Sequence, residues 1–379
     1  MSSTVDKILI CILTPLSWLY GFVTWVRNKL FDAGVFKEEV FDVPIVSVGN
    51  LTVGGTGKTP HVEYIVDHLS TRYRMAVLSR GYKRSTSGFL LANSLSTPSS
   101  IGDEPMQIYR KYGMVAKIAV CENRSKGIKE LLRLFPDLEL IVLDDAFQHR
   151  WVKPKVSVLL MDHNRPVYKD KMLPLGRLRE GASATNRADM VIVTKCPEDM
   201  LPIDYRIQKK ELALMPYQQL FFSRYHYGEP TPVFPEDNPY HVSLSSLTSA
   251  DSVFLLTGIA YPRSFVRYFR NFSCKVKVAH YPDHHDYSRS DLEEIRNRFK
   301  ELKGARKIIV TTEKDAMRIA YNPYFPTELK KFIFYIPVNV KFINMLDETD
   351  FLESLVANIE KNPLNQQQSV SRSSDEGVS

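Results

Sequence analysis

The chain has 379 residues, of which 44% are hydrophobic and 25% charged, and its formal net charge is +7. This composition is typical of a globular protein with a sizeable core, and the length is typical of two domains. The four cysteines lack the spacing of a zinc site or disulfide framework, and no block of consecutive Lys and Arg indicates a nucleic-acid partner. The basic balance favours anionic partners such as phospholipids or phosphorylated substrates.

The first predicted element is a hydrophobic helix. Residues 8–26 carry no charge and include Trp18, Phe22 and Trp25, with basic residues on either side. The stretch is borderline for a membrane span of about 20 residues, and Pro15 weakens it. Dense aromatic residues flanked by bases are typical of a helix in the lipid headgroup region. An interfacial helix, a spanning helix and a buried core helix all fit this sequence, whereas a cleaved signal peptide does not.

An alternation of strands and helices follows. Short apolar runs predict strands at 44–49, 75–78, 118–120, 138–143, 156–161 and 190–194. After a segment rich in Pro and aromatic residues at 197–245, further strands are predicted at 252–256, 275–279, 307–310 and 332–336. This order predicts an α/β fold with a parallel sheet flanked by helices and a second, smaller α/β lobe. The expected parts are an N-terminal helix (1–30), a first domain (31–210), a second lobe (211–360) and a Gln/Ser-rich disordered tail (361–379).

A glycine-rich loop lies between the first predicted strand and the helix after it, in the run V-G-N-L-T-V-G-G-T-G-K-T-P at 48–60. Glycines let backbone N–H groups surround phosphate oxygens, Lys58 would neutralise β- and γ-phosphate charge, and the Thr59 hydroxyl would bind Mg²⁺. The Walker A pattern departs at its start, where Thr52 replaces the first glycine. The predicted fold is therefore P-loop NTPase-like, and its nucleotide-binding residues are Thr52, Val53, Gly54, Gly55, Thr56, Gly57, Lys58 and Thr59.

A second element of a nucleotide site is predicted at the end of the strand at 138–143. Asp144 and Asp145 follow this apolar run directly. Ligands of open α/β sheets gather at the carboxyl ends of the strands, so one carboxylate could serve Mg²⁺ while the other orients a base or substrate. The alternative is that both residues only cap the next helix.

The remaining polar motifs indicate the reaction class. Guanine specificity usually needs Asn/Thr-Lys-x-Asp, and the run at 194–197 (T-K-C-P) lacks the aspartate. No ABC-type signature lies between the loop and the acidic strand. Acidic residues and histidines instead follow predicted strands, at 102–105 (G-D-E-P) and 282–285 (P-D-H-H). Such groups suit activation of an alcohol, whose hydroxyl must lose a proton as the phosphoryl group arrives.

Together these motifs resemble the tetraacyldisaccharide 4'-kinase family of lipid A biosynthesis. Besides the loop at 48–60, the matching runs are L-S-R-G-Y-K-R (78–84), G-D-E-P (102–105), L-D-D-A-F-Q-H-R (143–150), L-P-L-G-R-L-R-E (173–180), T-G-I-A-Y-P (257–262), P-D-H-H (282–285) and V-T-T-E-K-D-A-M-R (310–318). The resemblance spans roughly residues 10 to 350, and the combination of motifs is specific. It departs from the family at Ala146, usually Gly, and at Arg177, usually Pro.

The resemblance implies transfer of the ATP γ-phosphate, with Mg²⁺, to the 4'-hydroxyl of a tetraacyldisaccharide 1-phosphate, forming lipid IVA. It also implies a peripheral or monotopic protein on the cytoplasmic face of the bacterial inner membrane. That location favours the interfacial interpretation of residues 8–26. The expected partners are the lipid disaccharide and the anionic membrane surface. Neither a nucleic acid nor an obligate protein partner is indicated.

The resemblance also implies roles for individual residues. Asp103 would be the general base for the sugar hydroxyl, with His284 of the second lobe as its partner, although His285 remains an alternative. Arg179 would stabilise the transferring phosphoryl group or hold the substrate phosphate. The remaining carboxylates would bind metal or orient groups, with Asp145 placed in catalysis and Asp144 and Glu104 joining Thr59 at the metal. A regulatory NTPase and a non-catalytic nucleotide-binding module are the alternative functions.

Overall fold

The structure is a computed structural model that describes residues 4–260, 262–343 and 345–361. It divides into two compact units, each built from separate stretches of the chain. Unit 1 comprises Met1–Leu51, Glu139–Arg224 and Lys341–Ser379, and unit 2 comprises Thr52–Leu138 and Tyr225–Val340. The tail expected at 361–379 lies outside the described residues except for Lys361. The domain boundaries expected at 30, 210 and 360 remain predictions.

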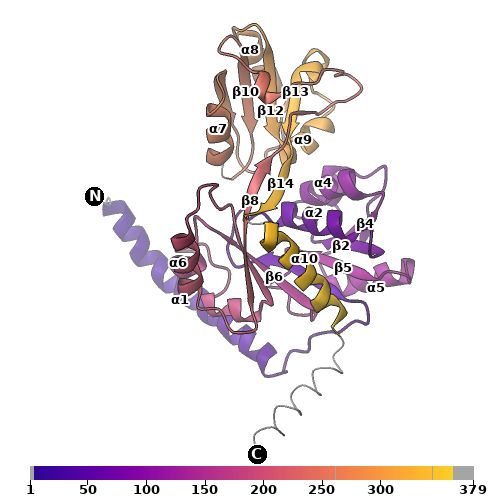
Figure 1. Cartoon of the computed structure of the whole chain (residues 1–379), viewed down its shortest axis with the longest axis vertical. Helices are drawn as coiled ribbons and strands as arrows, with labels where there is room; N and C mark the ends of the chain where they lie inside the picture. The colour runs from indigo at the N-terminus through magenta and orange to yellow at the C-terminus, as the bar shows by residue number, and fades with distance from the viewer. Residues whose placement is uncertain (1–3, 261, 344, 362–379) are drawn as a thin grey trace, which may run out of the picture. The chain divides into compact units, whose positions relative to one another are not determined.

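Unit 1 begins with one long helix, α1 (Thr4–Asp32), drawn in indigo in Figure 1. It contains the one stretch of the described chain that is long and apolar enough to cross a membrane, Ile10–Asp32, and only 6% of its apolar window is buried. The exposed apolar side chains are Ile10, Ile12, Leu16, Trp18, Leu19, Phe22, Val23 and Trp25. Because these side chains face outward, α1 is not the buried core helix that the sequence also allowed.

A narrow polar stripe of α1 faces the rest of unit 1. The buried Ser17 hydroxyl donates a hydrogen bond to the Met172 carbonyl at 2.8 Å, and the Tyr20 hydroxyl donates one to the Arg179 carbonyl at 3.1 Å. About two helical turns further on, Asn28 donates to the Glu180 carboxylate at 2.9 Å. This spacing of three to eight residues keeps all the contacts on one helical face, so α1 is exposed on its apolar side and held on its polar side.

The sheet of unit 1 is parallel, with strands in the order β8, β7, β6, β1 and β5. The strands are β1 (Ile45–Asn50), β5 (Leu140–Asp144), β6 (Val156–Asp162), β7 (Met190–Thr194) and β8 (Gln219–Tyr227), the last of which continues into unit 2. Every residue of β1, β5 and β7 is buried, as expected for apolar runs without polar alternation. The helical elements of this unit are η1 (Val167–Lys169), η2 (Ala182–Arg187), α6 (Pro202–Leu212) and α10 (Met345–Glu360).

Unit 2 contains two groups of strands. In the first, β4 lies between β2 and the short β3, parallel to β2 and antiparallel to β3. Its elements are α2 (Lys58–Leu69), β2 (Met75–Ser79), β3 (Leu90–Leu91), α3 (Pro98–Ile101), α4 (Asp103–Tyr112), β4 (Ala116–Val120) and α5 (Arg124–Leu134). A boundary strand, β14 (Val338–Phe342), continues into unit 1.

The second group is a five-stranded sheet in the order β11, β10, β12, β13 and β9, parallel except for β9. Its elements are β9 (Thr231–Pro232), η3 (Leu244–Ser246), β10 (Ser252–Thr257), α7 (Arg263–Arg270), β11 (Lys275–His280), α8 (Arg289–Lys300), β12 (Lys307–Thr312), α9 (Glu313–Ala320), η4 (Thr327–Phe332) and β13 (Ile333–Ile336). Alternate residues of β10 pack on opposite faces, with α7 on one and with α8 and α9 on the other. The predicted α/β fold with a second α/β lobe is confirmed.

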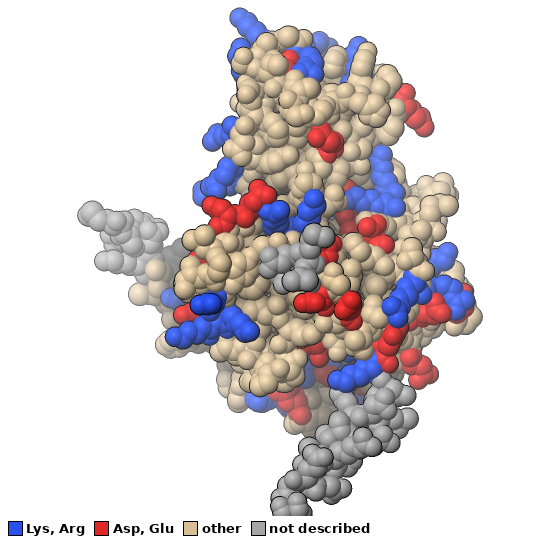
Figure 2. Space-filling view, viewed as in Figure 1, with Lys and Arg blue, Asp and Glu red and all other residues tan. Residues whose placement is uncertain are grey.

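The surface in view in Figure 2 carries Lys and Arg side chains interspersed with Asp and Glu. On this face the excess of positive charge is distributed and forms no single continuous basic patch. Mixed charge of this kind is typical of a solvated protein surface.

Candidate active site

The predicted phosphate loop connects the end of β1 at Asn50 to the start of α2 at Lys58. Gly54 and Gly57 have φ values of 113° and 90°, which a residue with a side chain rarely adopts. Gly57 is the N-cap of α2 and provides no side-chain cap, and the first turn holds no acidic residue. The N–H groups and positive dipole end of α2 are therefore suited to an anion such as a nucleotide phosphate.

Two side chains that the sequence did not single out lie against Gly57. A Cβ atom at Gly57 would lie 2.7 Å from the Tyr225 hydroxyl oxygen, closer than such atoms can approach. The Nδ1 atom of buried His61 lies 2.7 Å from the Gly57 carbonyl oxygen, and because a carbonyl only accepts, Nδ1 carries the proton. These contacts hold the last turn of the loop and require glycine at this position.

The carboxylates predicted beside the phosphate loop lie at the end of β5. β5 pairs with β1 so that Asp144 is opposite Val48, which places them next to the strand that leads into the loop. Asp144 is buried, and Asp145 adopts a φ of 48°, in the left-handed region. A non-glycine residue is held in this conformation only when its surroundings determine it, and such residues concentrate at functional sites.

Arg179 and Asp145, which the sequence analysis named separately, lie in contact. Its Nη1 atom donates to Asp145 Oδ1 at 3.0 Å and lies 3.4 Å from Gln148 Oε1. Its backbone N–H donates to the Leu51 carbonyl at 2.7 Å, and the Gln148 amide donates to the Asn50 carbonyl at 2.7 Å. Arg179 and Asp145 are therefore fixed at the residues that directly precede the phosphate loop.

Asp103 is the first residue of α4, and its side chain is 5% exposed. Arg318 of α9 donates two hydrogen bonds to it, from Nε to Oδ1 at 2.9 Å and from Nη2 to Oδ2 at 2.6 Å. His284 Nδ1 lies 2.9 Å from the same Oδ2 atom. Burial alone would raise the pKa of Asp103, but the hydrogen bonds from His284 and Arg318 outweigh it, so this pKa lies below its ordinary value.

The tautomer of His284 follows from its second neighbour. Lys314 Nζ lies 2.9 Å from His284 Nε2, and an ammonium group can only donate. Nε2 is therefore the acceptor, and Nδ1 carries the proton that it donates to Asp103 at 2.9 Å. Arg318 Nη2 lies further from Nδ1, at 3.2 Å, and donates to Asp103 at 2.6 Å. The adjacent His285 instead lies 3.0 Å from Asp291 and stacks on Tyr281. The structure thus pairs His284, and not His285, with Asp103.

The backbone of His284 is also held in place. His284 has a φ of 62°, and its N–H donates to the Gly258 carbonyl at 3.2 Å. The Gly258 N–H donates in turn to the buried carboxylate of Asp315 at 2.9 Å, and a Cβ atom at Gly258 would lie 2.6 Å from that carboxylate. α9 therefore holds this loop through Asp315 and Gly258. The same helix contacts the His284 ring through Lys314 and the Asp103 carboxylate through Arg318.

Glu104 contacts Lys314, whose Nζ lies 3.0 Å from Glu104 Oε1. Its expected role as a metal ligand stays a prediction, as does that of Asp144. Mg²⁺ in nucleotide sites is bound through one or two carboxylates or hydroxyls together with phosphate oxygens and water. The described residues contain no group of three or more His, Cys, Asp or Glu side chains arranged to hold a metal. The hydroxyl of Thr59 and the carboxylate of Asp144 have the oxygen chemistry that Mg²⁺ prefers.

Sequence reasoning missed the contributions of α9. Lys314 and Arg318 were part of the run at 310–318 that supported the resemblance, but no role was assigned to them. The available signal was the position of this run, which contains the end of a buried strand and the start of a helix with acidic and basic residues in its first turn.

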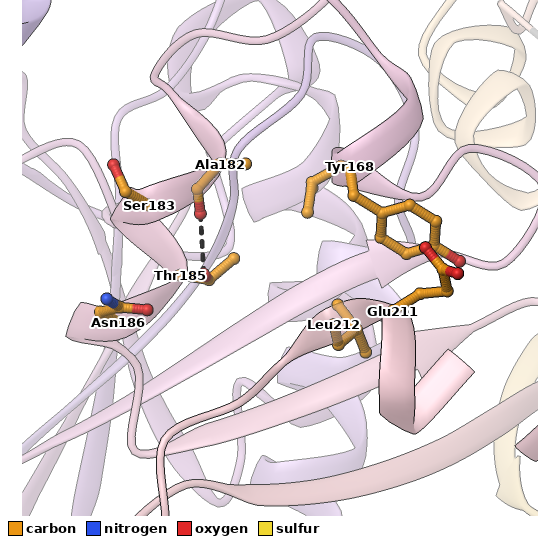
Figure 3. Close-up of a pocket in the computed structure, with 8 residues that line it drawn as sticks. Tyr168, Ala182, Ser183, Thr185, Asn186, Glu211 and Leu212 are labelled. Atoms are coloured by element: carbon orange, nitrogen blue, oxygen red, sulfur yellow. Dashed lines mark hydrogen bonds between the residues drawn. The ribbon is translucent and has the colours of Figure 1, made fainter. Parts of the chain in front are cut away.

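A pocket of about 210 Å³ in unit 1 lies outside this constellation (Figure 3). It is lined by Val167, Tyr168, Ala182, Ser183, Thr185, Asn186, Glu211 and Leu212. Burial and, to a smaller extent, the charge of Glu211 raise the pKa of Tyr168. No residue predicted for catalysis or binding is among those that line the pocket, so we assign it no part in the chemistry.

Comparisons with known proteins cover almost the whole chain. A family model described as tetraacyldisaccharide-1-P 4'-kinase matches residues 9–360. A relative from Bacteroides thetaiotaomicron, named tetraacyldisaccharide 4'-kinase, is 47% identical over 361 residues, which cover 93% of this chain and 94% of the relative. A relative of the same name from Porphyromonas gingivalis is 48% identical over 337 residues, which cover 87% and 92%.

Among solved structures, the "apo" form of LpxK from Aquifex aeolicus in complex with ATP matches with a TM-score of 0.70. It is 28% identical, and the match covers 93% of this chain and 100% of that chain. The chain therefore belongs to the tetraacyldisaccharide-1-P 4'-kinase family.

Proposed function

We propose that this protein transfers the γ-phosphoryl group of ATP to the 4'-hydroxyl of a tetraacyldisaccharide 1-phosphate, a step of lipid A biosynthesis that forms lipid IVA. Membership of the family supports this activity. The observation that carries it is the buried Asp103, held by His284 and Arg318 in the unit that also contains the phosphate loop. A buried carboxylate with an ordered histidine is unnecessary for nucleotide binding alone, but a hydroxyl acceptor needs a proton acceptor.

The donor side is formed by the loop from Thr52 to Thr59. Its backbone N–H groups and the N-terminus of α2 bind phosphate oxygens, and Lys58 neutralises charge on the β- and γ-phosphates. Thr59, Asp144 and Glu104 are the residues that would hold Mg²⁺, which when bound offsets further phosphate charge.

Arg179 and Asp145 act at the edge of the donor site. Arg179 presents a guanidinium beside the start of the loop, where it stabilises the transferring group or the phosphate of the substrate. Asp145 orients Arg179 through the 3.0 Å hydrogen bond. The left-handed backbone of Asp145 supports this assignment, because it fixes the direction of the carboxylate.

On the acceptor side, the oxygen of the 4'-hydroxyl forms a bond to the γ-phosphorus, the bond from that phosphorus to the β,γ-bridging oxygen breaks, and the hydroxyl proton passes to Asp103. The lowered pKa of Asp103 makes it a weak base towards a free alcohol. As the oxygen of the 4'-hydroxyl bonds to phosphorus, the hydroxyl proton becomes more acidic, and Asp103 is then a strong enough base to accept it. We therefore place proton transfer late, coupled to formation of the new bond.

The exposed apolar face of α1 supports a location at the cytoplasmic face of the bacterial inner membrane, with the helix lying in the headgroup region. Replacing Trp18, Phe22 and Trp25 with serine should release the protein from vesicles of anionic phospholipid. The contacts made by Ser17 and Tyr20 stay intact in this variant. Undiminished sedimentation with vesicles would contradict the membrane role of this face.

The activity is tested by incubating the full chain with ATP, Mg²⁺ and tetraacyldisaccharide 1-phosphate and measuring the mass of the lipid. We expect the mass to increase by one phosphate, and the gain to be lost in Lys58→Ala. ATP hydrolysis without any gain of mass on the lipid, and unaffected by the lipid, would instead indicate a regulatory NTPase.

A further inference from the structure

Two buried carboxylates and one partly buried ammonium group meet in unit 2. Lys111 Nζ of α4 lies 2.7 Å from Glu63 Oε2 of α2 and 2.5 Å from Glu313 Oε1 of α9. The side chains of Glu63 and Glu313 are each 4% exposed, and that of Lys111 is 23% exposed. Gln107, one turn before Lys111, donates to the other oxygen of Glu63 at 2.8 Å. We call Glu63, Lys111 and Glu313 the triad.

Each helix that contributes to the triad also carries part of the proposed active site. Glu63 lies one turn beyond Thr59, and α2 itself begins at Lys58. Lys111 lies eight residues from Asp103 along α4, a distance of about 12 Å at the usual rise of a helix. Glu313 begins α9 and is followed by Lys314 and Arg318, which contact His284 and Asp103.

The triad therefore links three helices by ion pairs: α2, which follows the phosphate loop, α4, which carries Asp103, and α9, which carries Lys314 and Arg318. An ion pair between two helices fixes both their spacing and their axial register, because the charged atoms have to meet at one point. Apolar contacts at the same place would allow the helices to slide, since they have no preferred direction.

We propose that the triad is a positioning element for Asp103, which sets the register of α4 against α2 and α9 and thereby the place of the Asp103 carboxylate beside Arg318 and His284. The proposal deepens the proposed function and rests on it, because it assumes that Asp103 receives the proton. Glu63, Lys111 and Glu313 are positioning residues and touch neither nucleotide nor acceptor.

The charge balance of the triad favours a role in addition to stability. Two buried carboxylates share one ammonium group, and burial, opposed in part by Lys111, raises the pKa of both Glu63 and Glu313. Well-packed apolar side chains are often as stable as a buried ion pair or more so. Tyr112 of α4 and Tyr335 of β13 face the same carboxylates, and burial together with those charges raises the pKa of both phenols. Arg110 of α4 adds a further positive charge near Glu313.

Two variants separate positioning from stability. Lys111→Met leaves two buried carboxylates without their ammonium group and should lower both the melting temperature and kcat. The charge-free variant, with Glu63→Gln, Lys111→Met and Glu313→Gln together, has no unpaired buried charge and should regain most of the melting temperature. It should still turn over about 10- to 100-fold more slowly than the wild type, because a misplacement of about 1 Å costs up to that factor. The KM for MgATP should change much less than kcat, since the phosphate loop stays complete.

A matched control uses another buried carboxylate of the same unit, paired with an arginine, that contacts no part of the site. Asp251 is 2% exposed and binds Arg306 at 2.8 Å. Asp251→Asn should lower the melting temperature without changing kcat, when all variants are assayed well below their melting temperatures. Equal losses of kcat in Asp251→Asn and Lys111→Met would overturn the proposal, because destabilisation of any kind would then explain the effect. Wild-type kcat in the charge-free variant would overturn it as well.

A measurement without substrate keeps the test independent of the proposed function. The ring ¹⁵N signals of His284, assigned by their loss in His284→Gln, report the contact between His284 and Asp103 in the ligand-free protein. They should shift in Lys111→Met and in the charge-free variant, and stay in place in Asp251→Asn. Unshifted signals in the charge-free variant would overturn the positioning role. Absence of lipid phosphorylation by the wild type would count against the proposed function alone.

Discussion

Helices α4 and α9 carry two charged clusters whose carboxylates are about equally buried but differ in their charge balance. The side chain of Asp103 is 5% exposed and that of Glu63 is 4% exposed. Asp103 receives two hydrogen bonds from Arg318 and one from His284, and its pKa lies below the ordinary value. Glu63 shares Lys111 with a second carboxylate, and burial raises its pKa to about 7.

The supply of donors, and not the depth of burial, therefore decides the protonation of these two groups. A buried carboxylate stays ionised where cations and N–H groups face it, and holds a proton more tightly where it competes for one ammonium group. The first arrangement suits a group that must accept a proton during a reaction. The second suits a fixed point between helices, where no charge has to change in turnover.

The largest effect on turnover is expected from removing the carboxylate of Asp103. Asp103→Asn should lower kcat by about 10²–10⁴-fold, the range for loss of a positioned proton acceptor. Its MgATP affinity should change little, because the loop from Thr52 to Thr59 is intact. The measurement is steady-state phosphorylation of the lipid, with His285→Gln as the control, since His285 contacts Asp291 and not Asp103. Near-normal turnover of Asp103→Asn would remove Asp103 from the role of base.

A smaller effect on turnover is expected from removing hydrogen-bond donors from Asp103, so that its surroundings resemble those of Glu63. Arg318→Met removes two charge-assisted hydrogen bonds from Asp103, so the pKa of Asp103 should rise and kcat should fall by about tenfold. Because the acceptor works in its ionised form, the acidic limb of the pH profile of kcat should move to higher pH. The kcat and the acidic limb of Arg318→Lys, which retains one positive charge, should lie between those of Arg318→Met and the wild type. An unmoved acidic limb would show that Arg318 does not set the ionisation of Asp103.

The smallest effect on turnover is expected in the second cluster when one carboxylate alone is neutralised. Glu63→Gln keeps the ion pair of Lys111 with Glu313, so kcat should change by less than about threefold.

The pH dependence of stability tests Glu63 more directly than turnover does. The pKa of Glu63 is raised in the native state from 4.5 to about 7, so its contribution is fully present below about 4.5 and is lost as the pH rises to about 7. The melting temperature of Glu63→Gln should lack this fall between pH 4.5 and 7, and parallel pH profiles of variant and wild type would contradict the raised pKa.

Much of the fold could be predicted because its strands are buried on both faces. The strands expected at 138–143 and 190–194 match β5 (Leu140–Asp144) and β7 (Met190–Thr194) to within two residues, since continuous apolar runs are typical of parallel sheets. The grouping into units could not be predicted, because each unit joins stretches separated by more than 80 residues. A local pattern contains no information on which distant strands pair.

The site shows the same limit at the level of single residues. The run P-D-H-H contains two neighbouring histidines, and the sequence does not say which one contacts Asp103. In the structure it is His284, whose φ is 62°. Arg318 lies 215 residues from Asp103, so its two hydrogen bonds have no counterpart in the sequence. The sequence also allowed α1 to be a buried core helix, whereas in the structure Trp18, Phe22 and Trp25 are exposed.

The sequence by itself determined the phosphate loop, the acidic ends of the strands and the family, because each depends on residues close together in the chain whose chemistry is local. Backbone N–H groups at Gly57, the ammonium of Lys58 and the hydroxyl of Thr59 suit phosphate and metal wherever the loop lies. Tertiary structure alone decided which carboxylate is ionised and which histidine faces it. Those properties depend on the charges within a few ångströms, and for Asp103 and Glu63 these come from α9 and α4, which only folding brings near them.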